Sequence, residues 1–148
     1  MSYTLQAIIG DNEMLRANAP ESANIASLPQ GKAMIPLCDE LLNETGIPFL
    51  PLTDGGQPEF ADAINGFVSP LIGRGKFAYV EAEFFGGDGT QACLTWDEKG
   101  NSSTAIVDST AINTALKFLG VQVGDCHDEF DALGVGRYRD TQGWLAEA

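Results

Sequence analysis

The sequence predicts an α+β fold in which an antiparallel sheet is packed by two or three helices. The N-terminal stretch alternates apolar and polar residues, as half-buried strands do. Residues 76–107 have the pattern of a β-hairpin that continues into a third strand, a meander. Elsewhere, apolar side chains recur at helical spacing, which gives a helix one apolar stripe to pack on a sheet. The order of these elements favours α+β.

The first half of the chain contains two expected strands. Residues 3–9 form the first, because apolar side chains alternate there with Thr4 and Gln6. Residues 33–37 form a short second strand. Pro36 places this second strand at a sheet edge or at its own end, since proline has no N–H to donate to the ladder.

Two helices are expected in the same half. Leucines within residues 37–42 have helical spacing, and Gly46 suits the C-terminal cap of a short helix. The clearer helix follows a proline-rich bridge and begins near Pro58, and Pro70 kinks or removes its last turn. Its apolar stripe consists of Phe60, Ala63, Ile64, Phe67, Val68 and Leu71.

The second half is more regular. Residues 76–96 predict a hairpin whose turn lies at the glycine-rich residues 86–89, and residues 103–107 predict the third strand. Asp108 or Ser109 is expected to cap a following helix. The glycine-rich turn is not a phosphate loop, because it joins two strands and not a strand to a helix.

Composition limits the function classes. The chain has 148 residues, of which 44% are hydrophobic, so we expect residues 1–148 to form one domain. Its 21 acidic and 8 basic residues give a net charge of −13, which repels phosphate backbones and argues against nucleic acid. No apolar run reaches the roughly 20 residues of a membrane span, and the start lacks a signal-peptide pattern. With three cysteines that form no C-x-x-C pair, we expect a cytoplasmic protein with free thiols.

The predicted hairpin carries the first candidate site. Glu81 and Glu83 lie on one face of its first strand, about 7 Å apart along the backbone. Two such carboxylates can share acid and base roles or hold a divalent metal. They can also form a solvent-facing charge pair, in which case the flanking Tyr79 and Phe85 make a protein-binding surface.

The C-terminal segment carries the second candidate site. Acidic residues crowd around His127, the only histidine, but their spacing matches neither an EF-hand nor a zinc motif. Arg137 and Tyr138 follow, and both residue types are favoured anchors in interfaces. These residues pair with the acidic group or bind a partner. The acidic group consists of Asp125, Asp128, Glu129 and Asp131.

Three segments resemble a group of small uncharacterised bacterial proteins. They are YTLQAIIG at the start, YVEAEFFGG followed by GTQ at the hairpin, and DEFDALGVGRYR near the end. The resemblance implies a bacterial cytosolic protein and brings no catalytic residue with it. A link between such small acidic proteins and immunity against secreted toxins is a hypothesis.

We therefore expect a non-enzymatic protein-binding module without cofactor or metal, and specifically an immunity protein that neutralises a basic bacterial toxin. An acidic domain can be steered onto a basic toxin and place carboxylates where the toxin binds phosphates. One alternative is a small metal- or carboxylate-dependent hydrolase that uses Glu81, Glu83 and His127. Another is a homo-oligomer that pairs through an exposed hairpin edge, and the sequence leaves monomer and homodimer open.

Overall fold

The computed structural model describes residues 2–53, 59–85 and 88–147. It has an α+β fold with one open, antiparallel sheet in the order β2-β3-β1-β4-β5-β6. The strands are β1 (Ser2–Asp11), β2 (Ala26–Ser27), β3 (Lys32–Pro36), β4 (Phe77–Phe85), β5 (Asp88–Trp96) and β6 (Ile106–Val107). The helices are α1 (Asn12–Asn18), α2 (Asp39–Thr45), α3 (Glu59–Val68), α4 (Ala111–Phe118) and α5 (Glu129–Leu133), with 3-10 segments η1 (Pro29–Gly31) and η2 (Thr141–Glu147).

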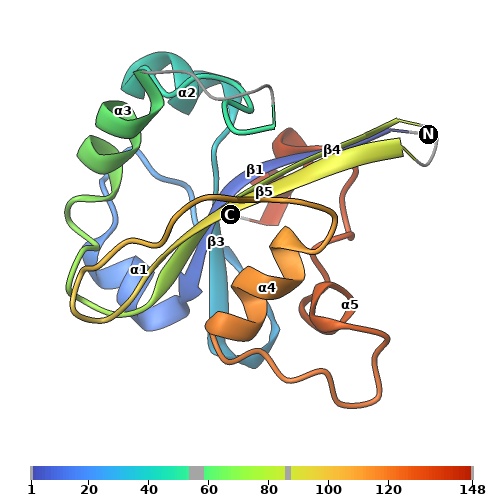
Figure 1. Cartoon of the computed structure of the whole chain (residues 1–148). Helices are drawn as coiled ribbons and strands as arrows, with labels where there is room; N and C mark the ends of the chain where they lie inside the picture. Colours follow the sequence, from blue (N-terminus) through green and yellow to red (C-terminus); the bar gives the residue numbers. More distant parts are fainter. Residues whose placement is uncertain (1, 54–58, 86–87, 148) are drawn as a thin grey trace.

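Helices cover both faces of the sheet. Figure 1 shows α2 and α3 on one side and α4 and α5 on the other. On the α2–α3 side, Ile8, Phe77 and Tyr79 of the sheet pack against apolar side chains of α1, α2 and α3. On the α4–α5 side, small residues such as Ala78 and Ala82 let the helices approach closely. The central strands therefore have two buried faces, where the alternating pattern predicted one.

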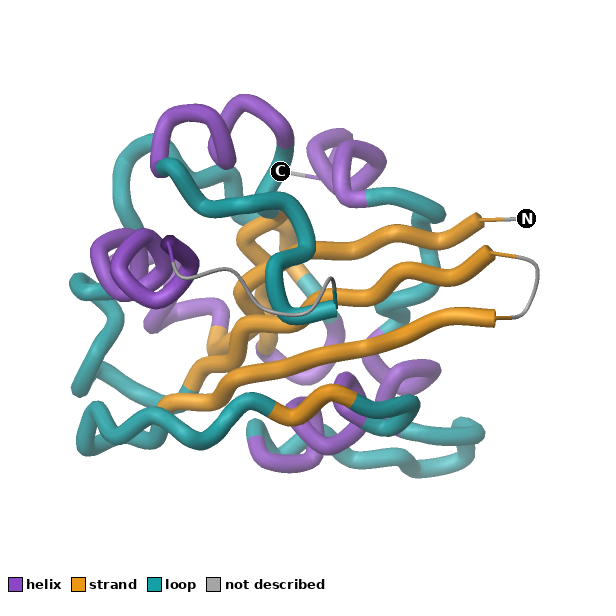
Figure 2. The backbone as a smooth tube through the Cα atoms, turned by 45° about the horizontal axis from the view of Figure 1, so that its top comes forward, coloured by secondary structure: helices purple, strands orange, loops and turns teal. Residues whose placement is uncertain are grey.

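The predicted strands are confirmed, with differences in length. β1 and β4 are the central pair, and β4 and β5 form the expected hairpin, with Phe77 opposite Trp96 (Figure 2). A Cβ at Gly89 would clash with Phe84 and the carbonyl of Glu83, which explains the glycine there. Residues 86–87 of the turn lie outside the described residues. The third strand is shorter than predicted, because β6 pairs only at Ala92 and Cys93.

The predicted helices are confirmed, but one predicted cap is wrong. Gly46 ends α2 with φ 75°, a left-handed conformation that glycine adopts without strain. The N-cap of α4 is Thr110 and not Asp108 or Ser109, and the Thr110 side chain makes no capping bond to the helix. Asp108 Oδ1 accepts from the N–H of Thr110 at 2.8 Å, one residue before the helix begins. The side chain of Gln91 on β5 accepts from the first-turn N–H of Ile112 at 2.9 Å instead. A tertiary contact supplies this cap.

The C-terminal segment is docked along the edge of β1 that pairs with β3 further along the strand. Pairing between β1 and β3 ends at Ala7, so the first residues of β1 need other partners on that side. The N–H of Thr4 donates to the carbonyl of Arg139 at 2.8 Å, and the N–H of Gln6 donates to Thr141 Oγ1 at 3.0 Å. The end of the chain thus takes the place of a strand beside β1. Trp144, which is 1% exposed, anchors it in the core.

Candidate functional site

Three polar side chains lie fully buried on the α2–α3 face of the sheet. Gln6 and Glu81 are opposite each other on β1 and β4, and Tyr79 lies two residues before Glu81 on the same face. All three are 0% exposed. Buried polar groups of this kind are costly unless they are hydrogen-bonded, so a small domain that keeps three of them together needs a compensating network. We call Gln6, Tyr79 and Glu81 the polar cluster.

Hydrogen bonds join the three side chains of the polar cluster in a row, from Gln6 through Tyr79 to Glu81. The Tyr79 hydroxyl donates to Glu81 Oε2, and Gln6 Nε2 donates to the Tyr79 hydroxyl oxygen at 2.9 Å. Glu81 Oε1 accepts from the backbone N–H of Thr53 at 2.6 Å. The ring of Tyr79 also lies 5.0 Å from the ring of Phe60 on α3, centre to centre, which fixes its orientation. These hydrogen bonds partner the buried polar groups of Tyr79 and Glu81 out of contact with solvent.

The polar cluster holds the segment between α2 and α3 on the sheet. We call residues 47–53 the strap. Gln6 Nε2 donates to the carbonyl of Pro48 at 3.0 Å, and Gln6 Oε1 accepts from the N–H of Leu50 at 3.2 Å. One buried amide therefore fixes the backbone on both sides of Phe49. Leu50 is buried and has φ 45°, a sparsely populated conformation that persists only where the surroundings impose it.

Burial controls the ionisation of the polar cluster. Burial raises the pKa of Glu81 above its usual 4.5, although hydrogen bonds from Tyr79, Thr53 and Leu52 oppose the increase. Burial, then the neighbouring Glu81 carboxylate, raises the pKa of Tyr79 well above 10. The phenol therefore stays protonated at neutral pH and serves as the donor to Glu81.

The raised pKa of Glu81 predicts that the free energy of unfolding depends on pH. The substitution Glu81→Gln should remove this dependence. Because the folded protein holds the Glu81 proton more tightly than the unfolded chain, this contribution to stability is full below the unfolded pKa. It is lost as the pH rises through the folded pKa. Urea unfolding of both proteins between pH 4 and pH 7 should show the wild type losing stability relative to Glu81→Gln as the pH rises. Parallel curves, or a change in the opposite direction, would contradict the assignment.

The residues predicted on the hairpin strand separate into buried and partly exposed ones. The prediction that Tyr79 and Glu81 offer a contact surface is wrong, because the strap and α3 cover that part of the face. Glu83 lies on the same face but beyond the strap contacts, and it is half-buried. The side chain of Phe85 lies outside the described residues.

The acidic tail remains largely at the surface. Asp125 and Asp131 are exposed, and Glu129 is half-buried. Asp128 has a structural role, because its carboxylate caps α5 by accepting from the N–H of Asp131 at 2.9 Å and also accepts from Asn113 at 3.2 Å. Two predicted residues remain, Arg137 and Tyr138. Arg137 is exposed, and its Cζ lies 5.7 Å from the centre of the Tyr138 ring. Tyr138 packs edge-on against Trp144.

The structure does not bring Glu81 and His127 together. His127 is exposed in the loop between α4 and α5, and the neighbouring Asp128 is bonded to Asn113 of α4. Both helices pack on the face opposite to the polar cluster (Figure 1). The hydrolase arrangement of Glu81, Glu83 and His127 is therefore wrong as a single site. Cys93 is buried, and burial raises the pKa of its thiol to about 11, so it is not an activated nucleophile either.

A pocket beside Phe49 is formed by residues of α2 and of the strap. Its volume is about 420 Å³. Phe49 is 51% exposed, and Asp39 and Asn43 of α2 are exposed as well. The N–H of Asp39 donates to Gln142 Oε1 at 2.9 Å, so the docked tail holds the start of α2. The pocket is lined by Asp39, Leu42, Asn43, Ile47 and Phe49.

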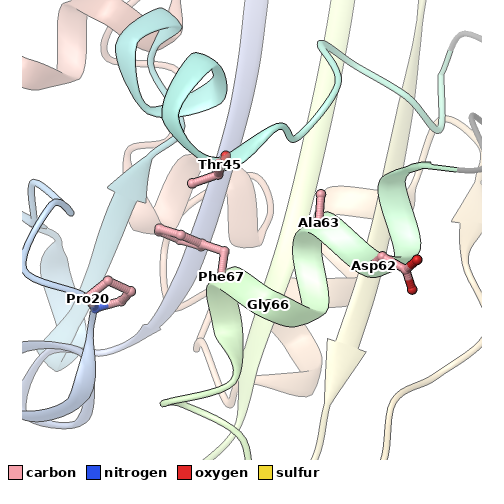
Figure 3. A pocket seen from close by; sticks show the side chains of 6 residues that line it. All are labelled: Pro20, Thr45, Asp62, Ala63, Gly66 and Phe67. Carbon is pink, nitrogen blue, oxygen red and sulfur yellow. The ribbon is translucent and has the colours of Figure 1, made fainter.

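A second pocket lies between the end of α2, α3 and the loop after α1. Figure 3 shows Phe67 reaching between Thr45 and Pro20, while Asp62 points away from them. The volume is about 350 Å³. Asp62 is the one titratable group among its lining residues, so the polar groups do not converge on a ligand position as they do in binding sites.

Sequence reasoning missed Gln6 and Phe49. Gln6 occupied a polar position of an alternating strand and was expected to face solvent, but the strap covers it. Phe49 stood in the proline-rich bridge, between Pro48 and Leu50. An aromatic residue in a proline-rich connection is a signal that could have been used, because such connections run over the surface.

Comparisons with protein-family models, with curated proteins and with solved structures found no match. The resemblance to small bacterial proteins therefore stays a prediction. Over the ranges that the structure describes, none of the helices has the length and apolar character to cross a membrane. In the same ranges, no three His, Cys, Asp or Glu side chains are grouped so that they could hold a metal ion.

Proposed function

We propose that the protein is a non-enzymatic binding module whose partner is a positively charged protein. We further propose that it acts in the cytoplasm as an immunity protein against a basic bacterial toxin. The observation that carries the proposal is the way one buried amide, that of Gln6, holds both neighbours of the exposed Phe49. An aromatic side chain presented on a fixed backbone loses little entropy on binding, as interface hot spots require.

Charge supports the choice of partner. The net charge of −13 attracts a basic protein over distances of about one Debye length, roughly 8 Å at physiological salt. Asp39, Glu40 and Glu44 on α2 are exposed, and Asp39 lines the pocket beside Phe49. Asp125 and Asp131 are exposed on the α4–α5 side of the sheet and add to the negative electrostatic field of the protein. These carboxylates would speed association, while Phe49 would contribute most of the affinity.

The strap and α2 replace the hairpin face as the proposed contact surface. Tyr79 and Glu81 then act from inside, because the polar cluster fixes the strap. This arrangement explains why a carboxylate and a phenol are kept in the interior without contact with solvent.

Substitution of Phe49 tests the proposal. Partners are captured from the native host, or by coexpression with the product of the neighbouring gene, and affinities are then measured with the purified pair. Phe49→Ala should weaken binding of a basic partner by at least about tenfold. Val107→Ala is the matched control, since Val107 is 50% exposed but lies on β6 at the sheet edge.

Two outcomes would overturn the proposal. One is equal binding by the wild type and Phe49→Ala. The other is the absence of any basic protein partner, together with self-association of the purified chain in light scattering. The second result would favour the homo-oligomer alternative, in which the edge strand β6 pairs across a two-fold axis.

A further inference from the structure

The pocket beside Phe49 combines three chemical features. Its floor is apolar, because Leu42 is 9% exposed and Ile47 is 3% exposed. The half-exposed ring of Phe49 also lines the pocket, together with Asp39 and Asn43, whose side chains carry a carboxylate and an amide. Such a pocket offers apolar contact, an aromatic face and hydrogen-bond acceptors to the same ligand.

We propose that this pocket receives an arginine side chain of the partner protein. The inference rests on the proposed function, which it deepens by naming the recognised group. The aliphatic part of arginine can lie on Leu42 and Ile47, while the planar guanidinium stacks on the ring of Phe49. Its N–H donors then reach the oxygens of Asp39 and Asn43.

The charges around the pocket favour a cation. The Asp39 carboxylate forms no ion pair with any other described residue, and Glu40 and Glu44 lie exposed on the same helix. These groups would repel an anionic ligand, and they would give a neutral ligand hydrogen bonds without charge attraction. Arginine fits better than lysine, because its guanidinium is flat, is more weakly hydrated and donates several hydrogen bonds in one plane.

The pocket is also held in place before any partner arrives. Gln6 fixes the strap on both sides of Phe49, and Gln142 of the docked tail binds the N–H of Asp39. The strap and the start of α2, which together form the pocket, are thus fixed by hydrogen bonds from distant parts of the chain. The partner's side chain would enter a preorganised pocket and would not have to order it.

The test uses the complete chain and the small probe N-acetyl-arginine amide, followed by heteronuclear NMR at low ionic strength. The neutral control is N-acetyl-citrulline amide, which has nearly the same shape without the charge. We expect saturable shifts of the backbone amides of Asn43 and Phe49 with the arginine probe. The citrulline probe should bind at least about fivefold more weakly.

Two variants locate the binding. Asp39→Asn should weaken the arginine probe about fivefold, as expected for one partly exposed charge pair. Asp62→Asn makes the same change of charge at an exposed residue of α3 outside this pocket and should leave the affinity unchanged. Non-saturable shifts, equal binding of the two probes, or equal effects of the two variants would overturn the arginine pocket.

The two proposals fail separately. If Phe49→Ala abolishes binding of a basic protein while the arginine probe does not bind, the binding module stands and the arginine pocket is wrong. If the arginine probe binds but no basic protein partner exists, the pocket stands as a guanidinium site and the proposed function is wrong.

Discussion

Replacing Glu81 by alanine is expected to lower the free energy of unfolding by about 3–5 kcal/mol at pH 7. The substitution leaves the buried hydroxyl of Tyr79 and the N–H of the half-buried Thr53 without their acceptor. Each unsatisfied donor costs about 1–3 kcal/mol, and the cavity left by the side chain adds to this loss. Urea unfolding followed by circular dichroism measures the difference.

Glu83→Ala is the matched control for this prediction. Glu83 lies on the same strand and the same face, two residues further along, but it is half-buried and its side chain forms no hydrogen bond in the described part of the chain. Its replacement should cost less than about 1 kcal/mol. If both variants lose the same stability, the polar cluster does not hold the strap as described.

The second large effect is expected at the C-terminus, where Trp144→Ala should cost about 3–5 kcal/mol. Trp144 is 1% exposed, lies in the core on the α4–α5 side and meets the ring of Tyr138 edge-on at 4.9 Å. Its loss also loosens the segment that supplies acceptors to Thr4 and Gln6 on β1. Thermal unfolding and hydrogen exchange at these two amides test both consequences.

Trp144→Phe distinguishes packing from hydrogen bonding. The indole N–H of Trp144 has no hydrogen-bond partner among the described residues, so phenylalanine loses volume but no bond. We expect it to recover more than half of the stability lost in the alanine variant. A cost below about 1 kcal/mol for Trp144→Ala would mean that the tail is not docked on the core in solution.

Both predictions bear on the proposed function. The polar cluster fixes the strap from inside, and the docked tail fixes α2 through Gln142. The exposed Phe49 and Asp39 depend on these two supports for their positions. Variants of the supports should therefore reduce partner binding even though their side chains do not touch the partner.

Local sequence patterns determined most of the secondary structure. The alternation in residues 3–9, the hairpin in 76–96 and the apolar stripe that follows Pro58 each depend on neighbours a few residues apart. Gly46 as a helix end is local for the same reason, since only the conformation at that one residue decides it. The α+β fold follows from the order of these elements.

Tertiary structure alone decided which polar residues became buried. The alternating pattern of β1 and β4 indicates which side chains share a face, but it does not tell what covers that face. Gln6 and Glu81 are buried because the strap packs over them. The residues joined by these hydrogen bonds are 28 to 44 positions apart in the sequence. The same reason made Gln91 the cap of α4 and gave the C-terminal segment its place beside β1. Contacts between distant segments leave no periodic trace in the sequence of either segment. The position of Phe49 in a proline-rich connection was a local signal, but the pocket that it shares with α2 exists only in the folded chain.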